Sequence, residues 1–261
     1  MQRVVRMIPR GLTVLAAVAS SIAAAAVPQA ERGVLLALYD STNGDDWGNH
    51  SGWGDPPGTE CSWYGITCDD AGTHVTGIDL GVNNLAGTLP PLSGLTRLES
   101  LVAVNNLLTG LIPPLAGLTH LRFVQLNFNA LAGSIPPLAG LGNLQFFGVD
   151  YNQLSGSIPS LAGLGNLESF EVTANQLSGR IPSLADLTSL SIFKVGDNQL
   201  SGNMPHAPTP NALFEGASQL CPNFLNPVPN AAWDAATGEM PWFQNCSPLP
   251  DPIYADGFDG P

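Results

Sequence analysis

Residues 138–160 read LAGLGNLQFFGVDYNQLSGSIPS, and the same pattern returns every 23 residues through the middle of the chain. Within this stretch Phe147 and Val149 alternate with polar or small residues just before Asn152. That alternation predicts a short strand with one buried face. A unit that recurs at a fixed period of this length predicts a stack of identical coils rather than a single folded core.

Four positions of the unit keep strict register. The asparagines are Asn83, Asn106, Asn129, Asn152, Asn175 and Asn198. The glycines are Gly87, Gly110, Gly133, Gly156, Gly179 and Gly202. The prolines are Pro90, Pro113, Pro136, Pro159, Pro182 and Pro205. The leucines that open the next unit are Leu92, Leu115, Leu138, Leu161 and Leu184.

Each recurring position has a physical role in a coil. The asparagine amide can bond backbone groups where the chain leaves the strand, so stacked asparagines form a ladder that satisfies buried backbone polarity. The glycine permits a tight turn, and the Ile-Pro step fixes an extended bend. Leucines three residues apart, such as Leu92, Leu95 and Leu98, are expected to point inward from a short helical turn. No unit can bury its apolar face alone, so neighbours must stack.

The segments NQLSGSIP (152–159) and NQLSGRIP (175–182) resemble the plant-type leucine-rich repeat, whose mark is N-x-L-x-G-x-I-P. The segments RGVLLALYDSTNGDDWGNHSGWG (32–54) and CSWYGITC (61–68) resemble the cap that precedes such arrays. The resemblance implies an α/β repeat solenoid with a parallel sheet on its concave face and often an extra short strand before the Ile-Pro. That family includes receptor-kinase ectodomains and polygalacturonase-inhibiting proteins. The 23-residue unit is slightly shorter than the family's usual one, and the sequence has no kinase segment.

The sequence divides into five parts. Residues 1–26 carry Arg3, Arg6 and Arg10 before an apolar run and end in small residues, which is typical of a secretory signal peptide. We expect an N-terminal cap at 27–75, six strand units at 76–205, a C-terminal cap at 206–247 and a flexible acidic tail at 248–261. The tail resembles short tails of exported bacterial proteins, which indicates a bacterial source and a periplasmic, secreted or cell-surface fate. No segment after the signal peptide is predicted to span a membrane.

Four cysteines flank the repeats, two on each side. An even number in an exported chain favours disulfides. We expect Cys61 to pair with Cys68 and Cys221 with Cys246, so that each cap is closed by one bridge. The spacing lacks the Cys-x-x-Cys element of a zinc site, so no metal is expected.

The chain is acidic, with 21 Asp and Glu against 8 Lys and Arg and a net charge of −13. Such a surface repels nucleic acid, and it favours neutral or basic partners. The sequence contains no nucleophile elbow, and its four histidines are scattered. Asp150 and Glu171 should lie on adjacent strands, but carboxylate pairs of this kind are common on acidic sheets. We therefore predict neither an enzyme nor a cofactor.

The predicted concave face carries aromatic residues on two neighbouring repeats. Exposed aromatic side chains on a rigid sheet are typical of an interaction hot spot. The candidate partner-binding residues are Phe123, Gln125, Asn127, Phe128, Phe146, Asp150, Tyr151 and Glu171. The sequence thus predicts a monomeric module that binds a protein or peptide on this face. Two alternatives stay open: an inhibitor of a secreted polysaccharide hydrolase, and an adhesive or structural surface protein that binds glycan.

Overall fold

The computed structural model describes residues 26–208, 212–244 and 246. The predicted signal peptide, apart from Ala26, and the predicted acidic tail lie outside these residues. Within the described part of the chain, no helix is both long enough and apolar enough to cross a bilayer.

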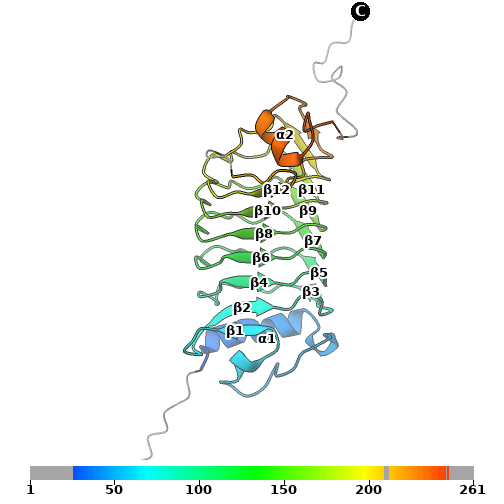
Figure 1. The fold of residues 1–261 in the computed structure, drawn as a ribbon. Helices are drawn as coiled ribbons and strands as arrows, with labels where there is room; N and C mark the ends of the chain where they lie inside the picture. Colours follow the sequence, from blue (N-terminus) through cyan, green and yellow to red (C-terminus); the bar gives the residue numbers. More distant parts are fainter. Residues whose placement is uncertain (1–25, 209–211, 245, 247–261) are drawn as a thin grey trace, which may run out of the picture.

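The repeats stack into a solenoid with one sheet along its front and a second along its side (Figure 1). The first sheet has seven strands, which are parallel except that β1 pairs antiparallel with β2. Its strands, in spatial order, are β1 (Ile66–Cys68), β2 (Val75–Asp79), β4 (Ser100–Val102), β6 (Phe123–Gln125), β8 (Phe146–Gly148), β10 (Ser169–Glu171) and β12 (Ile192–Lys194). We call the side of this sheet that is turned away from the core the open face. It corresponds to the face predicted to be concave.

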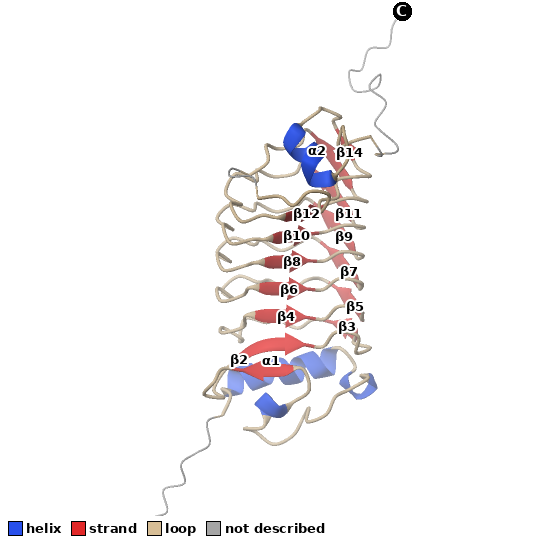
Figure 2. Ribbon diagram, in the orientation of Figure 1, coloured by secondary structure: helices blue, strands red, loops and turns tan. Residues whose placement is uncertain are grey.

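The second sheet is the extra strand that the family resemblance implies. Figure 2 shows its strands as a second column beside the first sheet. They are, in chain order, β3 (Ala86–Thr88), β5 (Leu107–Gly110), β7 (Ala130–Gly133), β9 (Gln153–Gly156), β11 (Gln176–Gly179), β13 (Gln199–Gly202) and β14 (Phe224–Leu225). The fold is therefore a parallel β-solenoid of leucine-rich-repeat type.

The third side of each coil consists of turns. In the second repeat Leu115, Leu118 and Leu121 are fully buried, and their backbones form two successive i→i+3 bonds: Leu118 N–H donates to the Leu115 carbonyl, and Leu121 N–H to the Leu118 carbonyl. The predicted short helical turn is thus a pair of tight turns. Among the described residues α-helices occur only in the caps, as α1 (Gln29–Ser41) and α2 (Ala231–Thr237).

The asparagines form the ladder between coils. Asn152 Oδ1 accepts from Leu131 N–H at 2.9 Å, and Asn152 Nδ2 donates to the Leu126 carbonyl of the preceding repeat at 3.0 Å. Nδ2 also lies within bonding distance of the Val149 and Asp150 carbonyls. One side chain therefore satisfies backbone groups of two coils.

The ladder extends beyond the six asparagines that the period identifies. Asn223 Oδ1 accepts from Leu200 N–H at 2.8 Å, and Asn223 Nδ2 donates to the Val195 carbonyl at 2.8 Å. The interval from Asn198 is 25 residues, two more than the repeat. A degenerate further coil therefore continues the ladder and the second sheet within the segment expected to form the C-terminal cap. At the other end Asn49 caps the ladder through two bonds between its backbone and Asn83.

An aromatic column fills the core of the last repeats. Phe147, Phe170 and Phe193 are fully buried and stack with ring centroids 5.6 and 5.8 Å apart. Trp233 of α2 extends the column at 5.8 Å from Phe193. The C-terminal cap is thus attached through the same core as the repeats.

The N-terminal cap covers the other end of the core. Two short 3-10 helices, η1 (Gly44–Asp46) and η2 (Glu60–Ser62), follow α1. Arg32 of α1 forms a buried ion pair with Glu60 and lies 5.0 Å from the centroid of the Trp63 ring. Trp47, Trp53 and Trp63 are all buried, so they serve as core residues of the cap.

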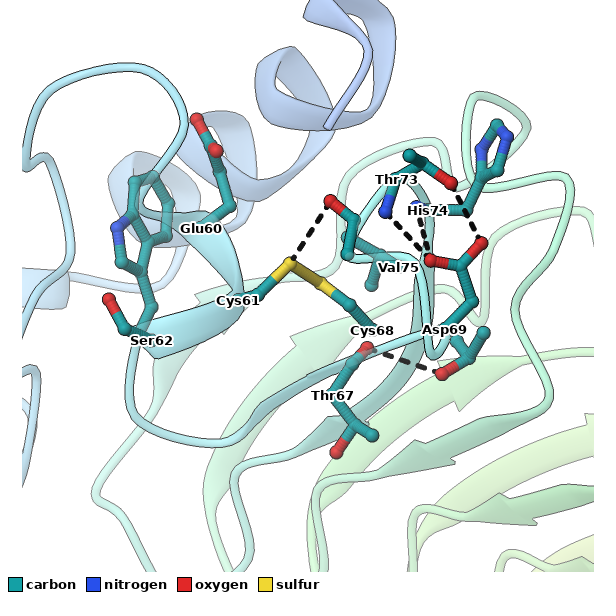
Figure 3. The surroundings of a disulfide bond; sticks show 12 residues. Glu60, Cys61, Ser62, Thr67, Cys68, Asp69, Thr73, His74 and Val75 are labelled. Atoms are coloured by element: carbon teal, nitrogen blue, oxygen red, sulfur yellow. Dashed lines mark hydrogen bonds between the residues drawn. A yellow bond between two sulfur atoms is a disulfide. The ribbon is translucent and has the colours of Figure 1, made fainter. Parts of the chain in front are cut away.

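Each cap holds one disulfide. Cys61 of η2 joins Cys68 of β1 (Figure 3), and Cys221 joins Cys246. Beside the first bridge the Asp69 carboxylate accepts from the Thr73 N–H at 2.7 Å, from the Thr73 hydroxyl and from the His74 N–H (Figure 3). These bonds hold the pKa of Asp69 below its usual value, and the bond from the Thr73 N–H contributes most.

Candidate functional site

The open face is built by alternation along the short strands. In β6 and β8 the middle residues Val124 and Phe147 are fully buried in the core. Their neighbours therefore point the other way. Phe123 pairs in register with Phe146, and Gln125 with Gly148. The residues predicted for the partner-binding face are thus adjacent in space.

A ridge of left-handed residues borders the open face where each strand ends. The residue directly before each of the six asparagines that the period identifies has a φ between 52° and 58°; these residues are Val82, Asn105, Phe128, Tyr151, Ala174 and Asp197. Residues other than glycine rarely adopt this backbone conformation, which costs about 1–2 kcal/mol at each position. The turn that it creates tips these side chains out of the coil.

Phe128 and Tyr151 lie next to each other on this ridge, and we call them the aromatic pair. Their rings stack with centroids 4.6 Å apart and an interplanar angle of 8°. The two residues are 50% and 52% exposed. The pair therefore presents apolar surface to solvent while its geometry is already fixed.

Phe123 and Phe146 contribute less exposed surface than predicted, because both are half-buried. The Arg122 guanidinium lies 5.4 Å from the centroid of the Phe123 ring. A Cβ at Gly148 would lie 2.6 Å from the Phe146 ring and 2.7 Å from Asn127 Oδ1. Any side chain at this position would have to displace the ring and the amide, since both rest directly on the Gly148 backbone.

The open face also contains a buried carboxyl pair, Asp150 and Glu171, which are 7% and 9% exposed. Asp150 Oδ1 accepts from the Thr173 N–H at 2.6 Å. Glu171 accepts from the Ser169 hydroxyl at 2.8 Å and lies 3.4 Å from the Lys194 ammonium. The sequence predicted that these carboxyls would lie on adjacent strands among the partner-binding residues. The structure places them below the surface.

Burial changes the acidity of this pair. Desolvation raises the pKa of Asp150 to about 7, the Thr173 N–H opposes the rise, and the charge and hydrogen bond of Glu171 add to it. The positive charge of Lys194 lowers the pKa of Asp150. The Asp150 carboxyl thus has a pKa close to neutrality.

Because its pKa is raised in the folded state, Asp150 makes the protein less stable as pH rises from its unfolded pKa towards 7, and the loss is complete above 7. The Asp150→Asn variant removes this penalty and keeps an oxygen for the Thr173 N–H. We therefore expect the variant to gain stability relative to wild type, by about 2 kcal/mol more at pH 8 than at pH 5. Urea unfolding at the two pH values measures this difference. An equal effect at both values would contradict the assignment.

Two buried polar atoms beside the carboxyl pair lack hydrogen-bond partners within the described part of the chain. They are Asn127 Oδ1 and Thr173 Oγ1. Asn127, Asp150 and Thr173 each lie two residues before a ladder asparagine, so they occupy the same position in three successive repeats. Sequence reasoning did not identify Thr173, Ser169 or Lys194 as parts of this site, although the period places all three beside predicted residues.

No group of three or more His, Cys, Asp or Glu in ranges 26–208, 212–244 and 246 could hold a metal ion. The open face therefore has three features: the aromatic pair, the half-buried Phe123 and Phe146, and the buried carboxyl pair.

Comparison with known proteins identifies the N-terminal cap. Residues 28–69 match the family model described as a leucine rich repeat N-terminal domain. A 45-residue stretch is 51% identical to Receptor-like protein 6 of Arabidopsis thaliana. That stretch covers 17% of this chain and 4% of the relative's length, so the likeness concerns a single segment.

Solved structures extend the likeness to the repeats. A plant ice-binding protein superposes with a TM-score of 0.64 over 76% of this chain and 73% of its own, at 21% identity, which shows a shared fold. A second structure is the leucine-rich-repeat ectodomain of the Arabidopsis thaliana membrane receptor kinase GASSHO1/SCHENGEN3, in complex with CASPARIAN STRIP INTEGRITY FACTOR 2. Its TM-score is 0.59 at 29% identity, covering 75% of this chain and 27% of that one. These relatives come from plants, and they give no support to a bacterial source.

Proposed function

We propose that this protein is an exported, non-enzymatic binding module that holds a protein or peptide partner on the open face of its first sheet. The observation that carries the proposal is the aromatic pair, two stacked and half-exposed rings at the border of that face. The proposed partner-contacting residues are Phe123, Gln125, Asn127, Phe128, Phe146, Asp150, Tyr151 and Glu171.

The aromatic pair has the properties of an interaction anchor. Large rings remove much apolar area from water on binding, and each has few rotatable bonds to immobilise. Stacking orders Phe128 and Tyr151 before a partner arrives, so that less entropy is lost on association. Both residues share the left-handed backbone of the ridge, which turns their side chains towards solvent.

The similar ectodomain of GASSHO1/SCHENGEN3 supports the partner class, because its structure contains a bound factor. The present chain spans about a quarter of that protein, so the identity of its own partner is a separate question. The two disulfides support an oxidising compartment, which agrees with the predicted signal peptide. Acidic charge disfavours self-association, so we propose a monomer.

The test is crosslinked capture of partners from the secreted and surface proteins of the organism. The bait variant is Phe128→Ala with Tyr151→Ala, and the control is Leu107→Ala with Leu111→Ala. The control residues are equally exposed apolar side chains of the repeats that lie on or beside β5 of the second sheet. Removing an anchor pair costs at least about 2 kcal/mol, or about thirtyfold in affinity.

We expect the same protein to be captured by wild type and by the control, and to be lost with the aromatic variant. Unchanged melting temperatures would exclude misfolding. Equal capture by the folded aromatic variant would overturn the proposal. Capture of a polysaccharide hydrolase would identify the module as an inhibitor, whereas retention on a glycan column that does not depend on Phe128 and Tyr151 would favour the adhesive alternative.

A further inference from the structure

The buried carboxyl pair is surrounded by acceptor atoms. Asp150, which follows β8, and Glu171 of β10 provide four carboxyl oxygens. Asn127 Oδ1 and Thr173 Oγ1 lie in the rows beside Asp150. The donors already present are few: the Thr173 N–H for Asp150, and the Ser169 hydroxyl and Lys194 for Glu171. The cluster accepts more hydrogen bonds than its own residues supply.

The unpartnered hydroxyl of Thr173 is an observation independent of the acidic charge. Thr173 is only 4% exposed, and its backbone N–H contacts Asp150 directly. Its side chain occupies the same open-face row as Asp150, one repeat further on. A buried polar atom without a partner costs about 1–3 kcal/mol, so a native structure that keeps one is poised to bond something else.

No cation of the described chain forms an ion pair with Asp150. The Lys194 ammonium forms an ion pair with Glu171, with Nζ and Oε2 3.4 Å apart. Arg122 forms an ion pair with Glu99 and a hydrogen bond with Gln145. Arg32 forms an ion pair with Glu60 in the cap. The remaining basic residues after the predicted signal peptide, Arg97 and Arg180, show no ion pair with an acidic residue of the described chain.

We infer that the open face binds a guanidinium group of its partner, an arginine side chain, at Asp150 with Glu171, Asn127 and Thr173 as further acceptors. The inference rests on the proposed function, and it names the chemistry of the partner. A guanidinium offers five N–H donors in a plane and no acceptor, which suits a cluster rich in oxygen acceptors. An ammonium offers three donors from one point and lacks the rigid planar fork that matches a carboxylate with two parallel bonds.

The aromatic residues fit the same ligand. Tyr151 directly follows Asp150 in the chain, and the half-buried Phe146 rests on the Gly148 backbone two residues before it. Guanidinium planes stack on aromatic rings, and the apolar stem of an arginine covers such rings well. The aromatic pair and the carboxyl pair would thus hold one arginine and its apolar neighbour.

Binding should also release a proton. Asp150 faces Glu171 on β10 and is influenced by Lys194 on β12, while β6 and its following turn contribute the uncharged Gln125 and Asn127. A cation placed on Asp150 favours its ionised form. Arginine binding below neutral pH should therefore shift the Asp150 carboxyl resonance towards the ionised value.

The experiment is an NMR titration of the disulfide-intact protein with two peptides, N-acetyl-Phe-Arg-amide and its citrulline counterpart. Citrulline keeps the shape of arginine and removes the charge. We expect saturable shifts at the Gly148 and Thr173 amides with the arginine peptide, and an affinity about tenfold lower with citrulline. Asp150→Asn should abolish the preference for arginine. Glu168→Gln, which removes an exposed carboxylate of the next repeat, the one that contains Glu171, should preserve it.

Equal affinity for the two peptides, or no saturable shift at Gly148 and Thr173, would overturn the guanidinium assignment. An equal loss of preference in Asp150→Asn and Glu168→Gln would overturn it as well, because general charge attraction would then explain the result. None of these outcomes would show whether partner capture depends on Phe128 and Tyr151. The two proposals can therefore fail separately.

Discussion

Replacing Phe170 by alanine is expected to lower the free energy of unfolding by about 3–5 kcal/mol. The ring is fully buried and stacks between Phe147 and Phe193, with centroids 5.6 and 5.8 Å away. Neighbouring coils are bound to the backbones on both sides, so they cannot collapse into the space left behind. Thermal and urea unfolding followed by circular dichroism measure the loss.

Phe214→Ala is the matched control for this prediction. Phe214 is an exposed aromatic residue of the C-terminal cap, so its truncation should change stability by less than about 0.5 kcal/mol. A Phe170 variant as stable as the Phe214 variant would show that the aromatic column does not support the stack.

Replacing Asn152 by alanine is expected to cost a similar amount, about 3–5 kcal/mol, for a different reason. The change leaves the Leu131 N–H without its acceptor and the Leu126 carbonyl without its Nδ2 donor. The Val149 and Asp150 carbonyls lose the same donor. Several backbone groups between two coils would then be unpaired at once.

The control for the ladder is Asn166→Ala, which removes one exposed hydrogen bond to the Gly142 carbonyl. It should cost no more than about 1 kcal/mol. Hydrogen exchange adds a local measurement, since the Leu131 amide should lose protection in the Asn152 variant. Retained protection at Leu131 together with unchanged stability would refute the role of the ladder.

The period in the sequence determines most of the fold because each recurring residue has one structural role. Asn152 and its equivalents could be assigned from spacing alone, since only a coil of fixed length brings them into a ladder. Asn223 was missed because its interval is 25 residues and its Gly and Pro positions are degenerate. The pattern Leu220-x-x-Asn223-x-Leu225 was the available signal.

The candidate site was only partly predictable. Strand alternation places Phe123, Phe146 and Gln125 on one face, but it does not give their depth. The exposure of Phe128 and Tyr151 depends on a left-handed turn, and the burial of Asp150 and Glu171 depends on how closely two repeats approach. These are properties of packing between coils rather than of the repeat itself.

The central claim is that a partner contacts the open face of the first sheet. The most direct measurement places the photocrosslinker p-benzoylphenylalanine at position 125 on β6, and separately at position 155 on β9 of the second sheet. Each folded protein is then irradiated with the secreted and surface proteins of the organism. We predict a specific adduct from position 125 and none from position 155. An adduct that forms only from position 155 would contradict the account, because the partner would then bind the second sheet.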